Sequence, residues 1–263
     1  MNITLIPGFN PGPYTGVGNN TYLIAGEHPT LIDAATGDSR HLDALGQALG
    51  TGGLARVLVT HGHSDHAAGS GAIAERWPDA EFLKKPWPDR DARYAVNWTP
   101  VPEAGEIPTG DTTLRPIHTP GHAPDHLCFF EEASRTLFCG DLLVQGATVV
   151  IPVSGGGSLT EYLASLQQIL ELKPATVLPA HGPEIEDPAP LIEHYYDHRR
   201  RREEQVVTAL RAGCTTREVL VERIYPDLSS DLVRAASETI WAHLIKLRGE
   251  GRVREEDGEW FLH

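Results

Sequence analysis

The chain is poor in cysteine and has no long apolar run. Its 263 residues include three cysteines, Cys128, Cys139 and Cys214, and no C-x-x-C motif. This odd, unpaired set argues against a disulfide framework or a zinc knuckle. No apolar stretch approaches the roughly 18 residues of a membrane-spanning helix, and the N-terminal residues resemble neither a secretory signal nor an Arg-rich targeting peptide. We therefore expect a cytoplasmic protein with no membrane partner.

Positive charge is also scarce. Lysine and arginine total 22 against 36 acidic residues, which gives a net charge of −14. Such an acidic chain has no general attraction for nucleic-acid phosphates or anionic lipid, so a nucleic-acid role would need a locally basic site. Histidine, in contrast, is plentiful at 13 residues.

Several of these histidines fall in one short segment. The stretch THGHSDH places His61, His63, Asp65 and His66 directly after the apolar segment 55–60. Neutral imidazoles and carboxylates are good ligands for zinc and similar metals. Four candidate ligands so close together point in different directions, so the spacing favours two metals, one bound by His61 and His63 and the other by Asp65 and His66.

Such a site needs further ligands, and they occur in order along the chain. TPGHAPDH supplies His122, FCGD supplies Asp141 and PAHG supplies His181. Each follows a short apolar segment that we interpret as a strand, and α/β sheets commonly place their sites beyond the carboxyl ends of strands. The four motifs together therefore predict a two-metal site, with His126 outside it as a supporting or packing residue.

The rest of the chain divides into two predicted domains. Residues 1–187 read as strands with interspersed helices over 39–50, 67–77 and 158–174, and residues 84–110 are Pro-rich and read as a loop that could form a lid or substrate wall. Residues 188–263 read as three helices, over 190–213, 215–225 and 230–251, followed by a hairpin with an Asp-Gly turn. Three helices and a hairpin outline a small winged-helix-like domain.

The ordered set THGHSDH, TPGHAPDH, FCGD and PAHG resembles the metallo-β-lactamase superfamily. The resemblance implies an α/β fold, the αββα sandwich, with a two-metal site between the sheets. It implies that the first metal binds His61, His63 and His122, that the second binds Asp65, His66 and His181, and that Asp141 bridges them. Two zinc ions are the expected cofactors, with other divalent metals as alternatives, and a metal-bound hydroxide is the expected nucleophile, oriented by Asp65 as the catalytic residue.

A closer resemblance covers nearly the whole chain. NPGPYTGVGNNTYLIAG, TPGHAPDH and HRRRREEQVVTAL are similar to the beta-lactamase-like protein 2 family, which includes a zinc-dependent endoribonuclease of single-stranded RNA. This resemblance implies a phosphodiesterase acting on single-stranded RNA. The core chemistry itself also fits a small-molecule thioester or lactone, or a weak β-lactam side activity, so a small ester or thioester is the alternative substrate.

The C-terminal residues give the RNA hypothesis little support. Arg199 to Arg202 are followed at once by Glu203 and Glu204, which is typical of a solvated helix face. The tail could instead shape the substrate cleft or form a homodimer contact. Lys84, Lys85, Arg90 and Arg93 could line an RNA groove, and a winged-helix regulatory protein that senses a ligand is the competing class of function.

Overall fold

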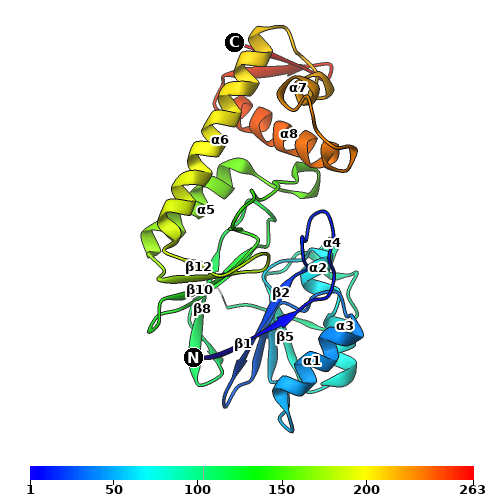
Figure 1. Ribbon diagram of the computed structural model, residues 1–263, viewed down its shortest axis with the longest axis vertical. Helices are drawn as coiled ribbons and strands as arrows, with labels where there is room; N and C mark the ends of the chain where they lie inside the picture. Colours follow the sequence, from blue (N-terminus) through cyan, green and yellow to red (C-terminus); the bar gives the residue numbers. More distant parts are fainter. Residues whose placement is uncertain (103) are drawn as a thin grey trace.

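The computed structural model describes residues 1–102 and 104–263, and it contains two six-stranded sheets packed face to face (Figure 1). The first sheet has the order β1-β2-β3-β4-β5-β6, antiparallel up to β3 and parallel from β3 to β6. Its strands are β1 (Asn2–Pro7), β2 (Asn20–Ala25), β3 (Thr30–Ile32), β4 (Arg56–Leu58), β5 (Glu81–Lys84) and β6 (Trp98–Pro100).

The second sheet has the order β12-β11-β10-β9-β8-β7. All of its neighbours are antiparallel except β10 and β11, which run parallel. Its strands are β7 (Ile107–Thr109), β8 (Thr112–His118), β9 (Leu127–Glu131), β10 (Thr136–Gly140), β11 (Thr176–Pro179) and β12 (Ile185–Glu186).

Both faces of the central strands are apolar, because each sheet is covered on both sides. Side chains of the two inner faces, such as Leu58 and Phe129, form one buried cluster between the sheets. The outer face of the first sheet packs Val57 against α1 and α3, and that of the second packs Phe130 against α5 and α6. Successive residues alternate between these layers, so the predicted αββα sandwich is confirmed.

Helices α1 (Ser39–Leu49), α2 (Ser64–Ala67) and α3 (Ser70–Arg76) belong to the first layer, and α5 (Leu159–Leu172) belongs to the last. The helix predicted over 67–77 is present as α3, but it begins later than predicted, because α2 ends at Ala67 and the chain turns at Gly69. A Cβ on Gly69 would lie only 2.0 Å from the Ala34 carbonyl oxygen. This close approach of two main chains excludes larger residues and turns the chain between the helices.

The Pro-rich stretch 84–110 is not a plain loop, although it was predicted as one. It contains α4 (Pro88–Asp91) and the strands β6 and β7, and residue 103 within it lies outside the described residues. The strands were missed because each has only three residues and includes a proline. Both lie at the edges of their sheets, where a missing N–H is tolerated.

The C-terminal part has the winged-helix arrangement expected from the sequence. It comprises α6 (Pro188–Arg211), α7 (Arg217–Ile224), the 3₁₀ turn η2 (Ser230–Leu232), α8 (Val233–Gly249) and the hairpin β13 (Val253–Glu256) and β14 (Glu259–Leu262). Trp260 of the hairpin, Leu220 of α7 and Ile240 of α8 share its own apolar core. The long helix α6 runs between the two parts (Figure 1). Its first half packs on the sandwich through Ile192 and its second half joins the C-terminal core through Val206, so the division between residues 187 and 188 stays a prediction.

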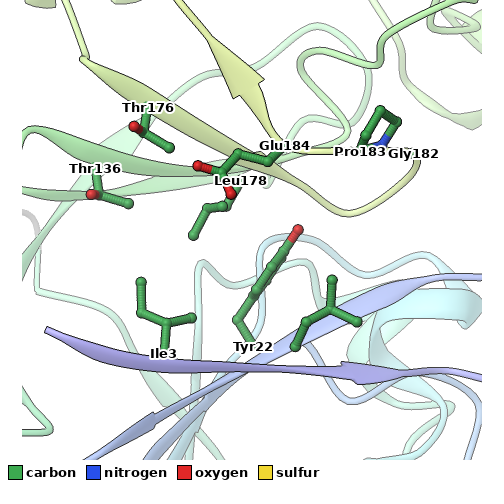
Figure 2. Close-up of a pocket in the computed structure, with 9 residues that line it drawn as sticks. Ile3, Tyr22, Thr136, Thr176, Leu178, Gly182, Pro183 and Glu184 are labelled. Atoms are coloured by element: carbon green, nitrogen blue, oxygen red, sulfur yellow. The ribbon is translucent and has the colours of Figure 1, made fainter.

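A cavity of about 330 Å³ opens between the two sheets (Figure 2). Ile3 and Tyr22 approach it from the first sheet, and Leu178 and Glu184 from the side of the second. The Tyr22 hydroxyl donates a hydrogen bond of 2.7 Å to the Pro179 carbonyl, which ties the sheets together at the edge of the cavity. Within the part of the chain that the structure describes, no helix is both long and apolar enough to cross a membrane.

Candidate metal centre

A first cluster of donor atoms combines side chains from both halves of the sandwich. Nδ1 of His63 lies 2.9 Å from Nε2 of His61 and 2.9 Å from Nε2 of His122. Oδ2 of Asp141 lies 3.3 Å from the same His122 nitrogen. Three imidazoles and one carboxylate oxygen therefore converge on one point.

A second cluster lies on the other side of Asp141. Its second oxygen, Oδ1, is 3.4 Å from Nε2 of His66 and 3.2 Å from Nε2 of His181. Oδ2 of Asp65 is 3.4 Å from each of these two nitrogens. Asp141 thus gives one oxygen to each cluster, as a bridging ligand would.

Strand ends explain why these seven residues meet. His61 and His63 follow β4, and His63 occupies the N-cap position of α2, whose first turn carries Asp65 and His66. His122 lies in the connection from β8 to β9, and Asp141 and His181 follow the parallel neighbours β10 and β11. Parallel strands end at the same edge of a sheet, so the last two side chains are brought together by the topology.

The spacing of the donor atoms fits metal ions. A tetrahedral zinc with bonds near 2.1 Å places its ligand atoms about 3.4 Å apart, and the separations above are 2.9–3.4 Å. Within the described residues, His66 Nε2 and Asp141 Oδ1 are buried without a hydrogen-bond partner. Buried polar atoms are rarely left unpaired. These groups could therefore hold metal ions, as the grouping of His61, His63 and His122 and of Asp65, His66 and His181 indicates.

A layer of hydrogen bonds orients the imidazoles. The Asp33 carboxylate contacts His66 Nδ1 at 2.8 Å and accepts a bond from the Thr60 main-chain N–H, also at 2.8 Å. His122 Nδ1 contacts the Val150 carbonyl at 2.7 Å. Such contacts fix the ring so that the opposite nitrogen faces the metal. Asp33 therefore supports the site through His66.

His126 belongs to this supporting layer, in agreement with its interpretation from sequence. Its Nδ1 contacts the Thr119 hydroxyl at 2.8 Å, and its Nε2 accepts a bond of 3.1 Å from the main-chain N–H of Asp141. Burial, reinforced by the charge of His122, lowers the pKa of His126 to about 3. The neutral ring thus holds Asp141 in place. Gly140 permits this contact because a Cβ there, at φ +49°, would lie 2.7 Å from His126 Nε2.

The electrostatics of the two clusters differ. Burial and the neighbouring imidazoles lower the pKa of His61 well below its usual value, and burial lowers that of His63 to about 3. Burial also acts to lower the pKa of His181, but the Asp141 carboxylate outweighs it and raises the pKa to about 9. The pKa of His66 is likewise raised, because Asp65, Asp141 and Asp33 together outweigh its burial. His61 and His63 are therefore neutral in the metal-free protein, whereas His66 and His181 hold protons.

Two further residues support the site without an obvious sequence signal. Asn19 lies in the connection from β1 to β2, and its Nδ2 donates to Asp65 Oδ2 at 3.3 Å. Asp125 accepts a bond of 2.8 Å from the N–H of Gly62, which separates His61 and His63. The asparagine lies in NPGPYTGVGNN, far from the metal-binding motifs in sequence. The aspartate lies in TPGHAPDH, where only the histidines have the residue type and position of candidate ligands.

Lys84, one of the four basic residues predicted as able to line an RNA groove, lies inside the protein, so that part of the prediction was wrong. The Lys84 side chain is 0% exposed, with Nζ 2.6 Å from Asp91 and 3.0 Å from Asp125. Arg199, the first arginine of the basic run, is also buried and donates to the Val149 carbonyl. The charge of these residues alone does not reveal that they are buried, because Asp125 and the Val149 carbonyl, which contact them, lie far away in the sequence.

Comparison with known proteins places the chain in a family. The sequence profile of the metallo-beta-lactamase superfamily matches residues 14–181, and that of the beta-lactamase associated winged helix domain matches residues 216–260. The chain is 32% identical to a beta-lactamase-like protein 2 homolog of Drosophila melanogaster, over all of this chain and 94% of that protein. It is 31% identical to an atrochrysone carboxyl ACP thioesterase of Passalora fulva, over 98% of this chain and 80% of the relative.

A solved structure agrees with these matches. The fold superposes with a TM-score of 0.83 on a metallo-beta-lactamase family protein of Thermus thermophilus, with 23% identity, over 99% of this chain and 98% of that one. Members of this superfamily bind divalent metals, and many of them are hydrolases. The chain belongs to the metallo-beta-lactamase superfamily, as a hydrolase that carries the winged helix domain associated with it.

Proposed function

We propose that the protein is a two-zinc hydrolase whose substrate is a small acyl thioester. The observation that carries the proposal is the sharing of Asp141 between two donor clusters, with one oxygen facing each. In this assignment His61, His63 and His122 hold the first ion, Asp65, His66 and His181 hold the second, and Asp141 bridges them. Five imidazoles and two carboxylates suit zinc, and without a thiolate they also suit iron or manganese.

A pair of divalent cations in this site supplies Lewis acidity and lowers the pKa of water toward neutrality. The residues themselves orient the reacting groups. The Asp65 side chain is 25% exposed, compared with 14% for Asp141, so Asp65 is the carboxylate nearer the solvent. Its position suits a ligand that also accepts a hydrogen bond from the attacking water and directs its lone pair. Asn19 Nδ2 donates to Asp65 Oδ2 at 3.3 Å, which helps to fix the orientation of the carboxylate.

The choice of a small substrate rests on charge. A polynucleotide needs a continuous basic track, but Lys84 is buried between two aspartates and Arg199 points into the protein. Arg200 is paired with Asp197 at 3.1 Å, and the chain carries a net charge of −14. A short substrate does not need such a track. A relative named as a thioesterase, aligned over 98% of this chain, supports an acyl thioester.

Single-stranded RNA is the second candidate. Its support is the 32% identity to a beta-lactamase-like protein 2 homolog over the whole chain, together with the associated winged helix domain. A β-lactam is disfavoured, since true β-lactamases generally have a residue other than aspartate at the position of Asp141. We still expect the protein to lie in the cytoplasm. A homodimer contact through the C-terminal domain also stays a prediction.

The proposal is tested by comparing substrates in parallel with zinc-loaded protein. The panel comprises an acyl thioester of N-acetylcysteamine, a labelled single-stranded RNA oligonucleotide and a chromogenic β-lactam. Chelated protein and an Asp65→Ala variant are the negative controls. Asp43→Ala, which changes an exposed side chain on the outer face of α1, is the matched positive control. Thioester turnover lost in both negative controls supports the proposal. Cleavage of the RNA without hydrolysis of the thioester would contradict the proposal and favour single-stranded RNA as the substrate.

A further inference from the structure

One wall beside the first donor cluster comes from the segment 84–94. The Trp87 ring lies 6.2 Å from the His63 ring, measured between centroids. Gly62, between His61 and His63, packs so closely on this wall that a Cβ there would lie 3.3 Å from both Trp87 and Arg90. The Tyr94 hydroxyl donates to the Gly62 carbonyl at 2.9 Å. The segment is therefore seated directly on the turn that carries two of the predicted ligands.

Arg90 is the cation of this segment that lies over the Trp87 ring. Its guanidinium lies 5.0 Å from the centre of the Trp87 ring, and the residue is only half-buried. Within the described residues it makes no ion pair and no side-chain hydrogen bond, whereas neighbouring Lys84 is held by Asp91 and Asp125. Arg90 thus presents an uncompensated positive charge beside the first cluster, in a protein with a large excess of acidic groups.

A glycine-rich turn packs against the same wall. The 3₁₀ turn η1 (Val153–Gly155) continues through Gly156, and a Cβ on Gly155 would lie 3.8 Å from Arg90 Nη2. A Cβ on Gly156 would lie 4.0 Å from Trp87. These are ordinary contact distances, so the glycine turn packs against the guanidinium and the ring without covering them with side chains. Glu238 of α8 accepts a bond of 3.0 Å from the Ser154 N–H, so the winged helix domain holds this turn in position.

We propose that Arg90 is a specificity-determining residue that binds one anionic group, a phosphate or a carboxylate, of the substrate. A guanidinium presents two parallel N–H donors that match a carboxylate or phosphate. Partial burial over Trp87 strengthens the attraction relative to a fully exposed arginine. One guanidinium held over Trp87 fits one anion, whereas a polyanion needs a track of several cations. The inference rests on the proposed hydrolase function, since the anion is placed beside the reacting group.

The test compares Arg90→Gln, which removes the charge and keeps a polar side chain, with Arg90→Lys and with the exposed Arg93→Gln as the matched control. Three N-acetylcysteamine or pantetheine thioesters are used: butanoyl (neutral), succinyl (carboxylate) and butanoyl phosphopantetheine (phosphate). We expect Arg90→Gln to lower kcat/KM about tenfold to a hundredfold for one or both anionic substrates. The neutral thioester should change less than about twofold, Arg90→Lys should recover part of the loss, and Arg93→Gln should resemble the unaltered protein.

Each result has a defined meaning. Loss on the succinyl substrate alone identifies a carboxylate, and loss on the phosphopantetheine substrate alone identifies a phosphate. Equal losses on charged and neutral substrates would show that Arg90 only shapes the wall, and an absence of loss would show that it does not bind substrate. Either of these outcomes overturns the proposal.

A second experiment tests anion binding by Arg90 without depending on which bond the enzyme hydrolyses. In metal-free, ¹⁵N-labelled protein, phosphate or succinate is titrated while the Nε–H resonance of Arg90 is followed. A saturable shift of this resonance that is absent for Arg93 supports the anion site even if no thioester is hydrolysed and the proposed function fails. No shift with either anion, together with charge-independent turnover, would reject the site while leaving a thioesterase function intact.

Discussion

The buried carboxylate of Asp33 lies 2.8 Å from Nδ1 of His66, and both side chains are almost completely excluded from solvent. Asp33 has a positive φ of 62°, a conformation that aspartate and asparagine tolerate better than most residues. The opposite nitrogen of His66 faces Asp65 and Asp141. One carboxylate outside the cluster thus fixes the direction of a predicted metal ligand.

Asp33→Asn should lower the metal affinity of the second site while leaving that of the first site nearly unchanged. Asparagine also tolerates the positive φ at this position, and its amide oxygen can still accept the hydrogen bond from the Thr60 N–H. It no longer offers His66 Nδ1 a negatively charged oxygen. Changes to such supporting groups typically cost about 10-fold to 100-fold in metal affinity. Competition with a chromophoric chelator measures both sites. Two ions bound with unaltered affinity would contradict the role given to Asp33.

Zinc binding should release more protons at the second site than at the first. The raised pKa values of His66 and His181, the latter about 9, keep both rings protonated at pH 7 in the metal-free protein. The lowered pKa values of His61 and His63 leave those rings neutral. Metal must displace the protons it meets, so affinity at the second site rises with pH up to about pH 9. Calorimetric titration in buffers of different ionisation enthalpy counts the protons, and equal release at both sites would refute the assignment.

Arg199→Ala should loosen the first site as well as destabilise the fold. The buried guanidinium donates to the Val149 carbonyl, and the next carbonyl, that of Val150, holds His122 at 2.7 Å. Leaving a buried acceptor unpaired costs about 1–3 kcal/mol in the free energy of unfolding. Arg200, with a side chain 71% exposed, provides the matched control, and its alanine variant should stay within about 0.5 kcal/mol. Urea denaturation and metal content are measured together, and unchanged zinc stoichiometry at the first site would argue against the link to His122.

Lys84→Met should destabilise the protein strongly. Removing the ammonium leaves Asp91 and Asp125 without their cation, and Asp125 is 1% exposed. Breaking one partner out of a buried ion pair costs about 3–5 kcal/mol. The double variant Lys84→Met with Asp125→Asn should recover part of this loss, because it removes one of the uncompensated charges. A single variant as stable as the unaltered protein in urea would show that the pair contributes little.

Sequence was sufficient for the parts of the site that follow a local rule. Five of the predicted ligands each follow a short apolar segment: His61, His63, His122, Asp141 and His181. Because residues that follow strands gather at the edges of sheets, this pattern was enough to predict that they lie in one region. The three helices and the hairpin of the winged-helix domain could also be predicted, because helical spacing and an Asp-Gly turn are local signals. That these side chains act as metal ligands is still a prediction.

Contacts between residues that are distant in the sequence could not be predicted from it. The interior position of Lys84 depends on Asp125, 41 residues further along the chain, and that of Arg199 on the Val149 carbonyl, 50 residues earlier. The break between α2 and α3 depends on how closely Gly69 approaches Ala34. No pattern of residue types within one segment encodes such pairings, so they emerged only from the fold.

The central claim is that seven side chains hold two metal ions with Asp141 between them. Anomalous diffraction from crystals of the zinc-loaded protein, recorded above and below the zinc edge, tests it directly. We predict two peaks, one contacting His61, His63 and His122, the other contacting Asp65, His66 and His181, and both contacting Asp141. A single peak, or peaks elsewhere in the molecule, would contradict the two-metal site and the hydrolase mechanism built on it.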